Sequence, residues 1–311
     1  MNMDLFDLHC DTPIEIYRGG DFISGYPHIT KEKLSGIGRY RQLAAFCCPH
    51  DLGDGEGFRL FFRVAETFRE AAAKAGYTVS PDGDPGGGNF TLTVEDARIL
   101  DGDPRKLDAL LSAGVGLFTP LWGGPTCIGG AHDTDEGLTP FGKEVVRECA
   151  RRGIPVDVSH ASVRSADDIF EILADEGMPP IATHSNAYSL CRHSRNLRDG
   201  QIDIIREAGG LVGVSLCPRH LTGDGAPTSE DAARHIIFYL ENLGPGRVAL
   251  GCDFDGIGST PSDIKNVSEI GNLRKTLTAL GVDEATVNAV FYENAAGYFD
   301  KIRKLKGSKN R

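Results

Sequence analysis

Short apolar runs alternate with amphipathic stretches along most of the chain. Eight runs have the length and apolar content of buried strands, at residues 4–8, 42–48, 90–94, 115–119, 154–158, 180–183, 211–216 and 247–252. Apolar positions recur with helical spacing between the later runs, at residues 142–152, 165–176, 201–208 and 229–243. Strands that alternate with helices predict βαβ units and a parallel sheet. Because such crossovers are right-handed, eight of them close most naturally into a TIM-like (β/α)8 barrel.

One segment, at residues 77–89, interrupts this alternation. It is rich in Gly, Pro and Asp and contains three consecutive glycines, which predicts a loop or a disordered insertion. It is too short to separate two domains. The sequence therefore predicts that residues 1–311 form a single α/β barrel domain.

Charge and composition exclude several classes of partner. The formal net charge is −11 and no internal block of Lys or Arg breaks it, which argues against a nucleic-acid or anionic membrane surface. No apolar run reaches the ~20 residues that a membrane span requires, and the first residues lack the basic region of a secretory signal. The eight cysteines are scattered without a CxxC pair, which favours reduced thiols. We therefore expect a cytoplasmic protein.

Residues able to bind a metal stand at the ends of five predicted strands, where barrel enzymes carry their active sites. Taken singly, His160 or His184 is better interpreted as a hydrogen-bonded core histidine, and Glu95 as an acid at a helix N-terminus. Five such strand ends at one barrel mouth favour a metal site instead. The segments are DLHCD at 7–11, VED at 94–96, DVSH at 157–160, THS at 183–185 and GCDFD at 251–255.

The alternation of side chains along a strand places these candidates on the inward face. His9 and Asp11 are two residues apart, so both side chains point to the barrel mouth and form a chelating pair for a metal such as Zn²⁺. His160 and His184 end adjacent strands and can converge on one metal. A carboxylate between the two pairs, from Glu95, could bridge two metals about 3.5–4 Å apart that share a hydroxide.

The same segments resemble a known family. DLHCD, TVEDA, VDVSHAS, THSNAYSLCRHSRN and GCDFDG follow one another like the signature segments of the membrane (renal) dipeptidase family, over nearly the whole chain. The resemblance implies a TIM-like barrel with a binuclear zinc site. By position, His9 and Asp11 would hold one metal, and Glu95 would bridge to the other. His160 and His184 would hold that second metal.

The resemblance also implies roles for residues outside the metal set. Asp253 would be the acid on strand eight that handles the proton, and Arg195 would grip the carboxylate of the substrate. Trp122 and Tyr188 are candidates for the pocket walls, although ordinary packing explains each equally well.

The chain departs from the family pattern at two positions. In the better-known members the bridging glutamate is followed by two glycines, whereas here Glu95 is followed by Asp96 and Ala97. The mammalian members carry a histidine after strand four where this chain has Trp122, which bears on the substrate range. Other barrel hydrolases bridge their metals with a carboxylated lysine on strand four. Residues 115–119 contain no lysine, so Glu95 is the better candidate for the bridge.

The sequence thus predicts a zinc-dependent dipeptidase with two divalent metal ions, in which Asp253 and Glu95 are catalytic and a metal-bridging hydroxide attacks the amide bond. Donor sets of this kind also accept Mn²⁺ and Co²⁺. One alternative is a barrel metallo-hydrolase for an N-acyl amino acid, a cyclic amide or a lactone. Another is a degenerate, non-catalytic barrel. The resemblance also implies a homodimer.

Overall fold

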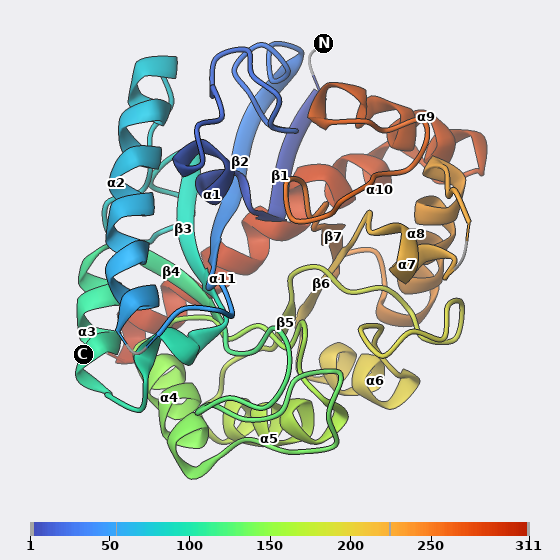
Figure 1. Ribbon diagram of the computed structural model, residues 1–311. Coiled ribbons are helices and arrows are strands. Elements are labelled where there is room, and N and C mark those ends of the chain that lie inside the picture. Colours follow the sequence, from blue (N-terminus) through green and yellow to red (C-terminus); the bar gives the residue numbers. More distant parts are fainter. Residues whose placement is uncertain (1–2, 54, 224, 310–311) are drawn as a thin grey trace.

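Parallel strands form the centre of the molecule. The computed structural model describes residues 3–53, 55–223 and 225–309. Its strands form one parallel sheet in the order β4-β3-β2-β1-β7-β6-β5 (Figure 1). The strands are β1 (Met3–Cys10), β2 (Ile37–Cys47), β3 (Phe90–Glu95), β4 (Val115–Thr119), β5 (Ile181–Ala182), β6 (Leu211–Val214) and β7 (Val248–Leu250).

The two outer strands of this sheet, β4 and β5, are joined through a short extended segment. Val156 forms a parallel bridge with Phe118 of β4, and Asp157 forms one with Ile181 of β5. Seven strands and this segment therefore close a ring, which confirms the predicted TIM-like barrel architecture.

The prediction of a full strand at residues 154–158 is wrong in extent, because only two isolated bridges form there. Pro155 has no N–H to give to a ladder. The side chain of Asp157 also takes up backbone donors that a ladder would use, since its Oδ1 accepts from the N–H groups of Ser159 and Thr183, each at 2.9 Å. The same contact at Thr183 ends β5 one residue earlier than predicted.

Helices surround the ring of strands (Figure 1). Four of them were predicted, and each begins no more than two residues before its expected start. Side-chain caps fix several starts: Thr139 accepts from the N–H of Gly142, and Ser162 accepts from that of Ser165. The helices are α1 (Thr12–Tyr17), α2 (Glu56–Ala75), α3 (Arg105–Ser112), α4 (Pro140–Arg151), α5 (Val163–Asp175), α6 (Asp199–Glu207), α7 (Pro218–Leu221), α8 (Ser229–Leu243), α9 (Gly271–Ala279), α10 (Glu284–Asn288) and α11 (Asn294–Lys309), with short turns at η1 (Ala97–Leu100), η2 (Val267–Glu269) and η3 (Ala289–Glu293).

Buried strands and helix α11 fill the barrel and cover one of its ends. All residues of β3, β4, β6 and β7 are buried, as expected of parallel strands covered on both faces. Helix α11 packs at the amino-terminal ends of the strands. There the Tyr298 hydroxyl donates to the carbonyl of Pro179 at 2.8 Å, and Phe299 stacks on Phe6 at 5.5 Å between ring centroids. The carboxyl ends face the opposite way.

The glycine-rich segment at residues 77–89 is a loop before β3, on the side of the barrel that α11 covers. The N–H of Ser80 donates to the carbonyl of Phe90 at 2.7 Å, and Asp84 forms an ion pair with Arg303 of α11 at 2.9 Å. The hydrogen bond joins the two ends of the segment, and the ion pair holds its middle against α11. The segment is therefore a loop rather than a disordered insertion. Among the helices of the described ranges, none has the length and apolar character to cross a membrane.

Candidate metal centre

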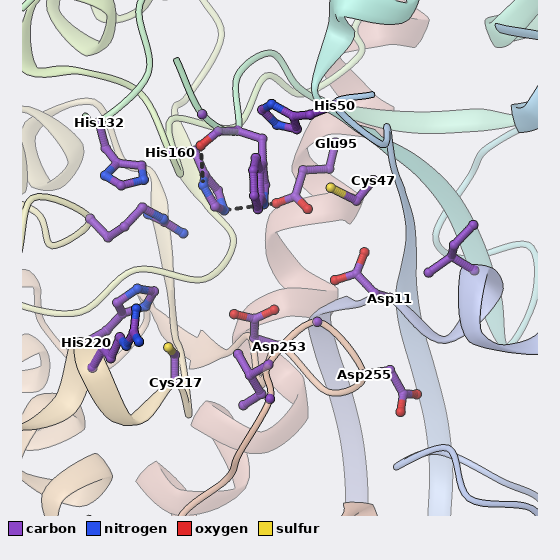
Figure 2. Close-up of a pocket in the computed structure, with 18 of the residues that line it drawn as sticks. Asp11, Cys47, His50, Glu95, His132, His160, Cys217, His220, Asp253 and Asp255 are labelled. Atoms are coloured by element: carbon purple, nitrogen blue, oxygen red, sulfur yellow. Dashed lines mark hydrogen bonds and ion pairs between the residues drawn. The ribbon is translucent and has the colours of Figure 1, made fainter. Parts of the chain in front are cut away.

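The carboxyl ends of the strands surround a cavity of about 950 Å³. Figure 2 shows the side chains of Asp11, Glu95, His160 and Asp253 facing this space from separate strand ends. These residues are far apart in sequence, and the closed ring brings them to one mouth. The site therefore lies where the strand-end pattern predicts it.

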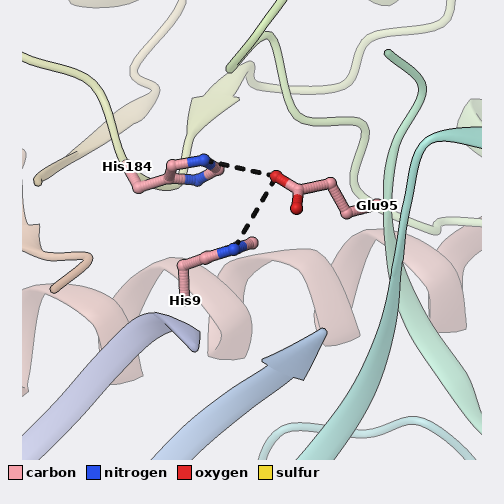
Figure 3. Close-up of side chains that lie close together, drawn as sticks. All are labelled: His9, Glu95 and His184. Carbon is pink, nitrogen blue, oxygen red and sulfur yellow. Dashed lines mark ion pairs between the residues drawn. The ribbon is translucent and has the colours of Figure 1, made fainter. Parts of the chain in front are cut away.

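Glu95, the last residue of β3, lies at the middle of the histidines. Its Oε1 is 3.1 Å from Nε2 of His160 and 3.4 Å from Nε2 of His184. The same oxygen is 3.7 Å from Nε2 of His9 (Figure 3). One carboxylate oxygen thus faces three imidazole nitrogens, which is the position expected of a bridging ligand.

His9 also faces a second group of carboxylates. Its Nε2 is 3.4 Å from Oδ2 of Asp11 and 3.9 Å from Oδ1 of Asp253. Two groups of residues each bring their donor atoms within 4.8 Å of one another. One group is His9, Glu95 and His184, and the other is His9, Asp11 and Asp253. Asp253, predicted only as an acid for proton transfer, is thus also close enough to contact a metal.

A buried hydrogen-bond chain fixes the tautomer of His184. The hydroxyl of Thr183 donates to Oδ2 of Asp157 at 2.5 Å, so its oxygen is left to accept from Nδ1–H of His184 at 2.7 Å. Nδ1 of His184 therefore carries the hydrogen. Its Nε2 carries the lone pair, which is the arrangement a metal ligand needs.

A backbone carbonyl fixes His160 in the same way. Nδ1 of His160 is 2.9 Å from the carbonyl oxygen of Trp122, which can only accept a hydrogen bond. Nε2 of His160 therefore also carries a lone pair, and it lies 2.9 Å from Nε2 of His184. Two lone pairs at this distance repel each other, and a cation between them removes the repulsion.

Several buried polar atoms of the site have no hydrogen-bond partner in the described part of the chain: Nε2 of His9, Oδ1 of Asp11 and Oε1 of Glu95. An unsatisfied buried polar group costs about 1–3 kcal/mol, and more when it is charged. Divalent cations would supply the missing partner for all three atoms. The nitrogen and oxygen donors present here fit Zn²⁺ and related ions.

The pKa values of the buried groups also indicate a site that lacks positive charge. Burial raises the pKa of Asp253 to about 7 and that of Glu95 to about 8, and the nearby Asp11 carboxylate adds to both shifts. Burial also lowers the pKa values of His160 and His184 well below the usual range. The neutral imidazoles of His160 and His184 thus lie beside crowded carboxylates. At His9, burial lowers the pKa, but Glu95 and Asp11 outweigh burial and raise this pKa to about 10. Bound cations would favour the ionised carboxylates and the neutral form of His9.

Two of these residues hold strained backbone conformations. His160 has a φ of 68° and Asp253 a φ of 63°, in the left-handed region that side chains with a Cβ rarely adopt. Such strain persists only where the surrounding structure imposes it, and it is typical of functional sites.

Arg195 lines the cavity and is only 4% exposed. One of its terminal nitrogens, Nη2, donates to the backbone carbonyl of His184 at 3.2 Å. Its Nε finds no partner within the described ranges. Burial lowers the pKa of Arg195, whereas Asp253 and Glu95 raise it. The buried guanidinium thus has donors left for an anion that enters the cavity.

The two predicted wall residues differ in placement. Trp122 lines the cavity, with its ring stacked on His160 at 6.1 Å between centroids. Tyr188 is not among the described residues that line it. Its ring packs against the guanidinium of Arg198, whose Cζ lies 4.3 Å from the ring centroid. The placement of Tyr188 as a pocket wall is therefore corrected.

Sequence reasoning missed three histidines that line the cavity beside Arg195. The ring centroids of His132 and His193 are 6.3 Å apart, and those of His193 and His220 are 4.9 Å apart. His132 and His193 come from two separate loops and His220 from helix α7, so no local spacing signals them. His193 supports the arginine directly, since its Nδ1 accepts from the backbone N–H of Arg195 at 3.2 Å.

The sequence from residue 84 to residue 310 matches the family model of the membrane dipeptidases, peptidase family M19. The chain belongs to this family. Its members are metallopeptidases, so this M19 protein is a hydrolase of the dipeptidase type that binds divalent metal. The match begins after His9 and Asp11, and the place of these two residues in the centre therefore rests on their geometry.

The chain is also similar to a bacterial relative and to two solved structures. An uncharacterised protein from the pqqA 5′ region of Klebsiella pneumoniae is 33% identical to this M19 protein over 213 residues, 65% of this chain and 77% of that protein. The crystal structure of dipeptidase AC, a metallopeptidase of family M19, is 25% identical with a TM-score of 0.87 over 96% of this chain and 98% of its own. A metallopeptidase from Rhodobacter sphaeroides, liganded with a phosphinate mimic of the dipeptide L-Ala-D-Ala, shares the fold at 24% identity and a TM-score of 0.88, over 97% of this chain and 100% of its own.

Proposed function

We propose that this M19 protein is a zinc-dependent dipeptidase that cleaves small dipeptides with a free C-terminal carboxylate. The observation that carries the proposal is the cavity itself, where the donor cluster around Glu95 and the buried guanidinium of Arg195 line one space. The first supports hydrolysis of an amide, and the second supports a substrate that bears a carboxylate. The dipeptide mimic bound to the Rhodobacter relative is of the same chemical class.

The donor geometry suggests how two ions are shared. His9, Asp11 and Glu95 would hold one ion, and Glu95, His160 and His184 would hold the other. When bound, the pair supplies Lewis acidity toward the scissile carbonyl and lowers the pKa of water toward neutrality, which yields a hydroxide nucleophile.

The remaining steps belong to side chains of the chain. Arg195 binds the substrate carboxylate in a bidentate, charge-assisted pair and so positions the amide bond over the donor cluster. The carboxylate of Asp253 accepts the proton of the attacking water and passes it to the nitrogen of the leaving amine. Trp122 forms part of the wall beside His160 and limits the size of the substrate there.

A second candidate is hydrolysis of an N-acyl amino acid. Arg195 favours it equally, because the guanidinium recognises the carboxylate and is indifferent to the group on the other side of the amide. A cyclic amide or a lactone would fit Arg195 only if its ring bears a carboxylate, so the guanidinium alone does not select among these substrates. A barrel without catalysis has no use for five convergent donors.

A panel of substrates tests the proposal on protein of measured zinc content. We expect turnover of L-Ala-D-Ala or L-Ala-L-Ala, little turnover of the corresponding C-terminal amides, and none of N-acetyl-alanine. Turnover of N-acetyl-alanine alone would support the second candidate. Zinc-loaded protein that cleaves neither class contradicts both. A cytoplasmic location and a homodimer stay predictions from the sequence.

A further inference from the structure

The residue after the bridging glutamate is a second carboxylate, and it is turned away from the metal donors. Asp96 is fully buried, with a φ of 69° in the left-handed region. Its side chain accepts two hydrogen bonds from Arg98, one from the backbone N–H at 3.2 Å and one from Nε at 2.7 Å. The pair forms a tight local turn directly behind Glu95.

The rest of the Arg98 guanidinium reaches the loop that follows β4. Its Nη2 donates to the carbonyl of Gly123 at 3.1 Å and to Nε2 of His50, also at 3.1 Å. Because a guanidinium only donates, Nε2 of His50 must be the acceptor. The ring of His50 in turn meets the ring of Trp122 edge-on, at 4.5 Å between centroids. Arg98 therefore contacts the Trp122–Gly123 segment in two ways, directly at the Gly123 carbonyl and through His50 at the Trp122 ring.

That segment contacts a predicted metal ligand through its backbone. The carbonyl of Trp122 is the acceptor for Nδ1–H of His160, at 2.9 Å. This bond decides which nitrogen of His160 faces Glu95. A shift of the Trp122 carbonyl would therefore rotate the His160 ring or free its tautomer.

We propose that Arg98, braced by Asp96, is a positioning residue for the metal centre. It fixes the Trp122–Gly123 peptide segment, and through it the orientation and tautomer of His160. The inference rests on the proposed function, since it assumes that His160 binds a metal. Supports of this kind behind a ligand typically change metal affinity or activity 10- to 100-fold.

The fork of the arginine is essential to this role. One guanidinium satisfies Asp96, Gly123 and His50 at once, in a fixed plane. A lysine at position 98 keeps the positive charge but has a single ammonium, which cannot hold all three acceptors. Arg98→Lys should therefore preserve the ion pair with Asp96 and lose the hydrogen bonds to Gly123 and His50.

The chain offers a matched control. Arg105 and Asp103 have the same spacing as Arg98 and Asp96 and repeat the same two hydrogen bonds, from N–H at 3.0 Å and from Nε at 2.9 Å. This second pair is on the surface, since the Arg105 side chain is 88% exposed. Arg105→Ala removes an equivalent local contact without touching the centre.

The test is zinc affinity, measured by competition with a chromophoric chelator on protein stripped of metal. In Arg98→Ala, we expect one of two zinc sites to weaken about 10- to 100-fold, with a smaller loss in Arg98→Lys. Arg105→Ala should stay within about twofold of the wild type. Thermal unfolding of the stripped proteins, recorded alongside, shows whether each variant folds.

The outcomes separate this inference from the proposed function. A folded Arg98→Ala variant with wild-type affinity at both zinc sites overturns the positioning role, even if its activity falls. If Arg98→Ala does not fold, Arg98→Lys decides in the same way, through weakened or unchanged zinc binding. Failure of the wild type to bind zinc contradicts the proposed metal centre instead.

Discussion

Nε2 of His160 lies 2.9 Å from Nε2 of His184, while the hydrogen of each ring is committed to its Nδ1. Two separate devices impose this arrangement, a backbone carbonyl for His160 and the hydroxyl of Thr183 for His184. Both rings therefore already have the tautomer of a metal ligand in the metal-free protein. Substitutions of the groups that fix these tautomers should consequently change metal affinity, as substitutions of the ligands do.

Thr183→Val should weaken zinc binding about 10- to 100-fold, because the isosteric side chain cannot accept from Nδ1–H of His184. Thr119→Val is the matched control. The hydroxyl of Thr119 donates to the same oxygen of Asp157 at 2.8 Å but does not contact His184. Chelator competition on the two folded variants checks the expectation. Equal zinc affinities in both would show that Thr183 does not set the tautomer.

Arg195→Met should reduce kcat/KM for a dipeptide about 100-fold, as expected for loss of a charge-assisted pair with the substrate carboxylate. The wild type should discriminate against the C-terminal amide by a similar factor, and the variant should not. Steady-state kinetics on both substrates form a double-mutant cycle that isolates the pair. Undiminished discrimination in the variant assigns the carboxylate to another group.

Asp253→Asn should lower kcat about 10²- to 10⁴-fold, because the amide can neither accept the proton of the attacking water nor deliver it to the amine. Its zinc content should stay near that of the wild type if proton transfer is the main role of Asp253. Zinc analysis and kinetics on one preparation check both points. A variant that loses a zinc ion in proportion to its activity would make Asp253 chiefly a ligand.

His235 should make the stability of the stripped protein depend on pH. It is buried, its Nδ1 accepts from the N–H of Ala187 at 3.1 Å, and its Nε2–H donates to the carbonyl of Leu221 at 3.0 Å. Burial lowers the pKa of His235 below its ordinary value of 6.5. The folded state therefore binds fewer protons than the unfolded state. The contribution of His235 to the free energy of unfolding is complete above about pH 6.5 and is lost as the pH falls further.

Urea unfolding of wild type and His235→Gln at pH 8 and pH 5 measures this contribution. The variant should be less stable at pH 8, by about 1–3 kcal/mol for the disturbed hydrogen bonds. The difference in unfolding free energy between wild type and variant should be smaller at pH 5, because only the wild type must keep a neutral histidine at this position. A gap that is independent of pH would contradict the assignment.

Much of the barrel could be predicted from the sequence, because strand length and apolar content are local properties. The start of α8 at Ser229 and the whole of β4 follow the pattern. The segment at residues 154–158 did not, since Asp157 competes with the backbone ladder through contacts to Thr183, 26 positions away. No pattern within the segment announces that competition.

The convergence of the candidate metal donors could be predicted for a related reason. His9 and Asp11 share a face because side chains alternate along a strand, and the closed barrel brings all strand ends together. The supports of the centre could not. The contacts of Trp122 with His160 and of Arg98 with Gly123 join loops 38 and 25 positions apart. Only the folded chain shows which loop carbonyl meets which histidine.

The most direct test of the metal centre is to measure zinc content and dipeptide hydrolysis on the wild type and on His184→Ala. His28→Ala is the control, because His28 contacts Asp255 at 3.6 Å and takes no part in the donor groups. We predict about two zinc ions per chain with turnover of L-Ala-D-Ala in the wild type and the control, and loss of both a zinc ion and turnover in His184→Ala. Dipeptide turnover that survives in His184→Ala, or in protein stripped of metal, would contradict the binuclear centre.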